Sequence, residues 1–122
     1  MDTQTLYREE LLEHYRNPLN FGKLSDFTAS AKQANPFCGD DVEIFVLLDK
    51  NRVVNIGFEG KGCAISMAGA SMLTERAKGK TKEELTKFSQ KDMLALLGIE
   101  VSETRKKCAL LALSVLKDCL EA

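Results

Sequence analysis

The spacing of apolar residues predicts one helix followed by a β-hairpin. Residues 4–16 carry apolar and aromatic side chains close to helical spacing, and an Asn-Pro pair ends this pattern. A loop-like segment follows, with a short strand expected near 27–33. Apolar residues then recur at alternate positions in two extended stretches, 42–48 and 52–58, separated by an Asp-Lys-Asn turn. We predict that these stretches pair as an antiparallel hairpin.

The second half of the chain carries helical patterns. Residues 63–79 predict a helix that ends at a glycine. A capping-box sequence, TKEE at 81–84, opens a short helix, and Ser89 with Asp92 can start another that ends at Gly98. An apolar stripe from residue 102 onward marks the last helix. The order of helix, strands and helices predicts an α+β fold, in which helices pack on a small antiparallel sheet. We expect one domain over residues 1–122.

Composition and charge exclude several classes of partner. The apolar fraction is 44%, the charged fraction is 29% and the formal net charge is −1, which gives no reason to expect nucleic acid or a membrane. The N-terminus has acidic residues where a secretory signal would have a basic start. The longest nearly apolar stretch, 108–116, is far shorter than the roughly 20 residues that cross a bilayer. We therefore expect a cytoplasmic protein that is a monomer or a weak dimer.

Four cysteines are the candidate chemistry of the chain. In a reducing compartment they favour metal binding or thiol chemistry over disulfides, and because no CxxC pair occurs, the fold must assemble any site. Each cysteine can also be a small buried hydrophobe. We keep that interpretation for Cys119, which lies about 16 Å along the last helix from Cys108 and cannot share a metal with it. The single histidine, His14, is expected to have a surface or capping role.

The other three cysteines have neighbours that core packing does not explain. Cys38 precedes Asp40 by two residues in an extended segment, so both side chains can face one pocket. Cys63 follows a Gly-Lys-Gly turn and begins a predicted helix, whose N–H groups and dipole favour a thiolate. Cys108 follows three basic residues, which favour a thiolate as well. Three cysteines and one carboxylate form a plausible four-coordinate set for zinc or an iron–sulfur cluster.

The segments around these residues resemble a known family. In chain order they are LYREELLEHYRNPLNFG, NPFCGD, GKGCAISMAGAS and RKKCALLAL. They are similar to the motifs of the U-type iron–sulfur cluster assembly proteins, which comprise the IscU and SufU scaffolds and the NifU N-terminal domain. The similarity extends over nearly the whole chain. It implies a SufE/NifU-like α+β fold with Cys38, Asp40, Cys63 and Cys108 as metal ligands at one exposed end.

The resemblance also implies a function and partners. A PLP-dependent cysteine desulfurase would deliver sulfur as a persulfide to one of the cysteines, with Cys38 and Cys108 as candidates. Scaffold members build a transient [2Fe–2S] cluster for iron–sulfur acceptor proteins, whereas the SufU type binds zinc and relays sulfur. Arg105 is placed to stabilise a thiolate or persulfide. On this interpretation the protein binds zinc or iron and is a scaffold or sulfur-transfer protein rather than a stand-alone enzyme.

The motifs combine features of two branches of the family. The GKGCAISMAGAS segment and Arg105 are closer to the SufU type, and Lys107 stands where the IscU type has a histidine. The Leu-Pro-Pro-Val-Lys segment that chaperones recognise in the IscU type is absent. The insertion that SufU-type proteins carry between the second and third cysteines is absent as well. We favour a SufU-like protein.

Two other classes of protein fit the same residues. A structural zinc-binding adaptor would unfold without its metal, because structural zinc supplies folding free energy. A thiol redox protein using Cys38 with Cys63 would need the geometry of a disulfide and no bound metal. The metal content of the purified protein and the folding of its metal-free form distinguish these classes from a cluster-assembly protein.

Overall fold

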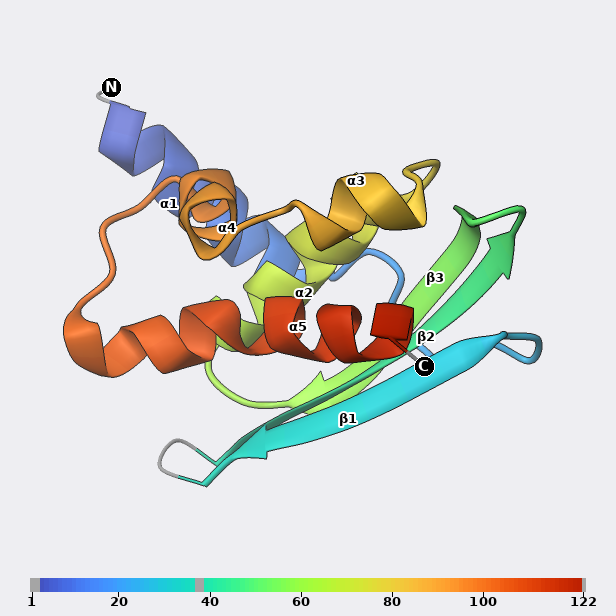
Figure 1. Cartoon of the computed structure of the whole chain (residues 1–122). Helices are drawn as coiled ribbons and strands as arrows, with labels where there is room; N and C mark the ends of the chain where they lie inside the picture. The colour runs from blue at the N-terminus through green and yellow to red at the C-terminus, as the bar shows by residue number, and fades with distance from the viewer. Residues whose placement is uncertain (1–2, 37–38, 122) are drawn as a thin grey trace.

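The protein is a three-stranded antiparallel sheet with its helices on one face. The computed structural model describes residues 3–36 and 39–121. The strand order is β1-β2-β3, and α2 and α5 lie against the sheet while α1, α3 and α4 lie farther from it (Figure 1). In chain order the elements are α1 (Thr3–Arg16), β1 (Ala29–Asn35), β2 (Asp40–Asp49), β3 (Arg52–Lys61), α2 (Ala64–Ala77), α3 (Lys82–Thr86), α4 (Gln90–Leu97) and α5 (Glu103–Glu121).

The strand register gathers three chain segments at one end of the sheet. Asn35 at the end of β1 lies opposite Asp40 at the start of β2. Asp41 on β2 lies opposite Lys61 at the end of β3. From there the chain passes through Gly62 and Cys63 into α2. The first turns of α5 lie at this same end, on the left in Figure 1. The fold therefore brings the segments that carry Asp40, Cys63 and Cys108 together.

The core lies between the sheet and the two helices that cover it. Alternate residues of β2, Val42, Ile44 and Val46, are fully buried on the face toward the helices. Nearly all of α2 from Ser66 to Thr74 is buried as well, because α1, α5 and β3 contact it from different sides. A helix that is covered on several sides needs few polar residues, which agrees with the mostly apolar and small residues that follow position 63.

The predicted capping box at Thr81 is confirmed, and the helix expected to start at Ser89 begins with a second one. Thr81 and Ser89 each accept a hydrogen bond from the backbone three residues later, and the side chains of Glu84 and Asp92 accept one in return. Backbone and side-chain hydrogen bonds from the N-cap residues, Thr81 and Ser89, hold the pKa of the Glu84 and Asp92 carboxyls below their ordinary values. The α4 helix ends at Gly98, which adopts a left-handed conformation with φ +72°.

The predicted α+β fold is confirmed, with small differences in the strands. The strand expected near 27–33 is β1, and the two hairpin strands extend further than predicted, through Asp40 at one end and Lys61 at the other. Within the two described segments, no helix combines the length and apolar character needed to cross a bilayer.

Candidate metal centre

Asp40, Cys63 and Cys108 converge from three separate elements. Asp40 opens β2, Cys63 is the N-cap of α2, and Cys108 lies in the second turn of α5. One carboxylate oxygen and the two sulfur atoms all lie within 4.8 Å of one another. Ligand atoms around a tetrahedral zinc ion are about 3.3–3.8 Å apart, because each metal–ligand bond is about 2.0–2.3 Å long. These three donors therefore fit a metal ion.

The carboxylate of Asp40 is fixed by a backbone group. Its side chain is 1% exposed. Oδ1 accepts a hydrogen bond from the N–H of Cys63 at 2.8 Å, and Oδ2 lies 3.8 Å from Cys63 Sγ. One oxygen thus holds the connection between β3 and α2, while the other faces the thiol. Asp40 can contribute one oxygen to a metal without giving up the bond that positions it.

The close approach of Asp40 requires a glycine at position 62. Gly62 has φ +155°, and a Cβ atom added there would lie 2.2 Å from Asp40 Oδ1 and 2.7 Å from Ser66 Oγ. No side chain fits in that space without displacing the carboxylate. The glycine before Cys63 therefore has a packing reason in addition to its conformational freedom.

The two described thiols of the cluster have different surroundings. Cys63 is half-buried, and its sulfur lies 3.7 Å from Ser66 Oγ. Cys108 is 1% exposed, and its sulfur lies 4.0 Å from the Asn35 side-chain nitrogen. Neither Asn35 nor Ser66 was singled out from the sequence as a site residue. Both were missed because their contacts depend on how β1 and the first turn of α2 meet the cysteines.

The remaining predicted site residues lie outside this cluster or outside the described chain. Cys38 falls outside the described residues. Arg105 is exposed and lies one turn before Cys108 on α5. His14, for which a surface or capping role was expected, is half-buried. Its Nδ1 lies 2.7 Å from Ser71 Oγ, so it links α1 to α2.

Cys119 packs in the core, as we predicted. It is 1% exposed, and its thiol donates a hydrogen bond to the carbonyl of Ile44. Burial raises the pKa of this thiol to about 12, and the negative charge of Asp118 adds to the effect. A thiol with this pKa stays protonated at neutral pH and is a poor nucleophile.

We expect iodoacetamide at pH 8 to modify Cys63 in the folded, metal-free protein and to leave Cys119 unmodified. Mass spectrometry of the digested protein measures both, and the urea-unfolded chain, in which both react, is the control. Faster modification of Cys119 than of Cys63 in the folded protein would contradict the assignment of Cys119 to the core.

The raised pKa of Cys119 also makes the stability of the fold depend on pH. Because the folded-state pKa of this thiol lies above the ordinary value of 9.0, the stability that the protonated thiol contributes is lost as pH rises from 9.0 toward about 12.

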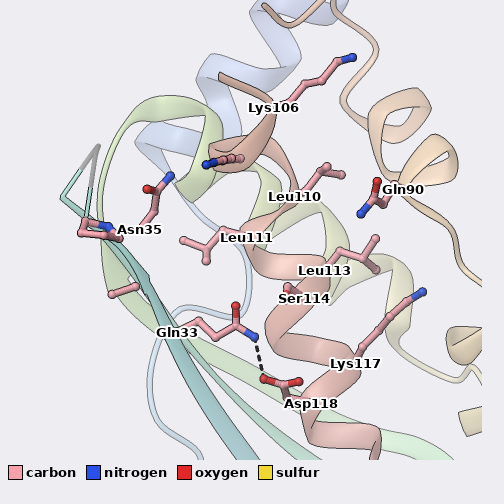
Figure 2. Close-up of a pocket in the computed structure, with 13 residues that line it drawn as sticks. Gln33, Asn35, Gln90, Lys106, Leu110, Leu111, Leu113, Ser114, Lys117 and Asp118 are labelled. Atoms are coloured by element: carbon pink, nitrogen blue, oxygen red, sulfur yellow. Dashed lines mark hydrogen bonds between the residues drawn. The ribbon is translucent and has the colours of Figure 1, made fainter. Parts of the chain in front are cut away.

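A groove with a volume of about 580 Å³ adjoins the Cys108 side of the cluster. It lies between the end of β1, α5 and the start of α4 (Figure 2). Gln33 donates a hydrogen bond to Asp118 across one end at 2.6 Å, and Asn35 lies at the other. The rest of the lining includes three lysines and three leucines: Lys106, Lys107, Lys117, Leu110, Leu111 and Leu113.

The fold and the cluster define a small α+β protein with cysteine and aspartate donors at one end of its sheet. The chain belongs to the family described as NifU-like N terminal domain, which matches residues 6–122. The resemblance inferred from the motifs is therefore confirmed.

Two curated relatives and one solved structure illustrate the similarity. The zinc-dependent sulfurtransferase SufU of Bacillus subtilis is 38% identical over 130 aligned positions, and the alignment covers 93% of this chain and 88% of that protein. The iron–sulfur cluster assembly scaffold protein IscU 1 of Archaeoglobus fulgidus is 36% identical over 112 residues, with 92% and 72% covered. The crystal structure of the SUF-system protein FiSufU from Fervidobacterium islandicum AW-1 superposes with a TM-score of 0.78 at 29% identity, covering 98% of this chain and 99% of that one.

Proposed function

We propose that this protein is an iron–sulfur cluster assembly protein that accepts sulfur from a cysteine desulfurase. It binds zinc, iron or a nascent [2Fe–2S] cluster through Cys38, Asp40, Cys63 and Cys108. The observation that carries the proposal is the convergence of a carboxylate oxygen and two sulfur atoms within 4.8 Å. The names of the SufU and IscU relatives support it. Its partners are a PLP-dependent cysteine desulfurase and iron–sulfur acceptor proteins.

The donor set suits a site that binds its cargo and later releases it. Thiolates are soft ligands that bind zinc and iron strongly, whereas the carboxylate of Asp40 is a harder ligand. A bound zinc ion would keep the cysteines deprotonated. An Asp40 oxygen released from a bound metal would stay in position, because the N–H of Cys63 holds Oδ1 of the same carboxylate at 2.8 Å. The carboxylate is therefore ready to bind again.

Sulfur transfer requires a thiolate on the acceptor cysteine. This thiolate attacks the terminal sulfur of the desulfurase persulfide, and a new S–S bond forms while the S–S bond of the donor breaks. The electron pair leaves on the desulfurase cysteine, which takes up a proton, so no external oxidant or reductant is needed. Cys38 and Cys108 remain the candidate acceptors. Cys108 is 1% exposed, so transfer to it requires that the residues covering it move.

Arg105 has the role of stabilising the anionic persulfide. It is exposed in the first turn of α5, three residues before Cys108. A guanidinium group remains charged at all relevant pH values and offers several N–H donors to an anion. Together with Lys107 in place of a histidine, Arg105 supports a SufU-like protein.

An anaerobic reconstitution tests the proposal. The zinc-loaded protein is mixed with a cysteine desulfurase, cysteine and Fe²⁺ and followed by ultraviolet–visible spectroscopy and intact-mass measurement. A persulfide on the protein with zinc retained supports the sulfur relay, and cluster absorption bands support the scaffold. Formation of neither species would overturn the proposed function.

Asp40→Ala and Asp40→Asn are both expected to prolong the lifetime of a bound cluster, because the carboxylate that opens the site to ligand exchange is lost. Asn keeps an oxygen that can accept the N–H of Cys63, so only Asp40→Ala also loses this buried hydrogen bond, at about 1–3 kcal/mol of stability. Cluster transfer to an apo-ferredoxin, followed by absorbance, measures the lifetime, and thermal unfolding measures the stability. An unchanged lifetime in both variants would contradict the role of Asp40 as the displaceable ligand.

A further inference from the structure

We propose that Ser66 and Asn35 are positioning residues that each hold one thiolate of the centre through a neutral hydrogen bond, Ser66 for Cys63 and Asn35 for Cys108. The inference rests on the proposed metal site and adds to it. The two donors come from different elements, the first turn of α2 and the last residue of β1. Each therefore reaches its own sulfur independently of the other.

Ser66 is fully buried beside Cys63. Its hydroxyl donates to the carbonyl of Cys63 at 3.1 Å, and its oxygen lies 3.7 Å from Cys63 Sγ. A serine hydroxyl has one hydrogen, which rotates to serve the better acceptor. When Cys63 is a thiolate, its charged sulfur is a stronger acceptor than a neutral one. Ser66 can then donate to the sulfur by rotation of its hydrogen alone.

Asn35 approaches Cys108 from the sheet. It is 7% exposed, and its side-chain nitrogen lies 4.0 Å from Cys108 Sγ. In the antiparallel register Asn35 lies opposite Asp40, so neighbouring strand ends present a donor and a ligand to the same centre. Figure 2 shows the Asn35 amide on the side of β1 that faces α5. An amide nitrogen donates without adding a charge to the site.

A hydrogen bond to a metal-bound thiolate draws electron density from the sulfur and fixes its orientation, which tunes the metal site. A sulfur that has lost its donor is more nucleophilic toward an electrophile. Because Ser66 and Asn35 contact different sulfurs, they control the reactivity of Cys63 and Cys108 separately. A site that frees one cysteine at a time needs such a difference between its ligands.

The test measures the two cysteines separately in the full-length protein loaded with Zn²⁺ alone. Iodoacetamide modification of Cys63 and Cys108 is timed by mass spectrometry in the parent protein, Ser66→Ala and Asn35→Leu. Ser66→Ala is expected to raise the rate at Cys63 relative to Cys108 about three- to tenfold, and Asn35→Leu to shift the ratio the opposite way. Competition with a chelator is expected to show about tenfold weaker zinc binding in each variant.

Ser71→Ala is the matched control. Ser71 is another buried serine on α2, and its hydroxyl oxygen contacts His14 and accepts the N–H of Leu19 instead of contacting the cluster. This variant is expected to unfold at a lower temperature and to keep the ratio of the two alkylation rates. Ser66→Thr retains the hydroxyl and is expected to restore the parent ratio.

An unchanged ratio in Ser66→Ala and Asn35→Leu, or equal acceleration of both thiols, would overturn the inference. Should Asn35→Leu fail to fold, the Ser66 variants decide by the same ratio. A parent protein that binds neither Zn²⁺ nor Fe²⁺ would contradict the proposed function itself. A zinc-binding parent whose variants keep its ratio would contradict only the roles of Ser66 and Asn35.

Discussion

Cys63→Ser and Cys108→Ser are each expected to lower zinc affinity about 100-fold, whereas Cys119→Ser is expected to leave it unchanged. Four-ligand zinc sites bind with about 10–16 kcal/mol, so one ligand contributes about 3 kcal/mol, or about 100-fold. Cys63 and Cys108 have their sulfurs in the cluster with Asp40, and serine supplies no thiolate. The same loss is expected for Cys38→Ser from its proposed role. Competition with a chromophoric chelator at fixed pH measures all four variants.

Cys119→Ser is an informative control because Cys119 lies on α5 with Cys108 and is equally buried. Any general effect of placing a hydroxyl in the interior of α5 therefore appears in this variant too. Its thermal transition is expected to fall slightly, while the carbonyl of Ile44 remains an acceptor for the new hydroxyl. If Cys119→Ser lost as much zinc affinity as Cys108→Ser, the assignment of ligands would be wrong.

Local chemistry made much of the fold predictable from sequence. The capping boxes at Thr81 and Ser89 join groups three residues apart, so the sequence alone contains both partners. The hairpin follows from alternating apolar positions in the same way. The burial of Cys119 was predictable because it continues the apolar stripe of the last helix. In each case the residues that decide the structure are close together in the chain.

The contacts that shape the metal centre could not be predicted in this way. The hydrogen bond from the N–H of Cys63 to Asp40 joins residues 23 positions apart, and the contact between Asn35 and Cys108 spans 73 positions. They exist only because the sheet register and the docking of α5 bring these segments together. The sequence therefore indicated Asp40 as a ligand but not as the acceptor that holds the start of α2.

Gly62→Ala is expected to weaken zinc binding about 10- to 100-fold, the range for residues that position metal ligands. The new Cβ atom would lie 2.2 Å from Asp40 Oδ1, so the carboxylate must move away from the N–H of Cys63. The same atom would press on Ser66 Oγ at 2.7 Å. Both the ligand and the neighbouring hydroxyl are displaced, although no ligand is replaced. Chelator competition measures the zinc affinity, and thermal unfolding measures the stability.

Gly79→Ala separates this steric effect from backbone strain. Gly79 also has a positive φ, +78°, but a Cβ atom added there meets no atom within 4 Å. Both substitutions carry the cost of a positive φ, about 1–3 kcal/mol, and both are expected to lower the unfolding temperature. Only Gly62→Ala moves Asp40, so only it is expected to lose zinc affinity. Equal affinities in the two variants would mean that the position of Asp40 against Cys63 does not control metal binding, and Asp40 would then have to act through its charge alone.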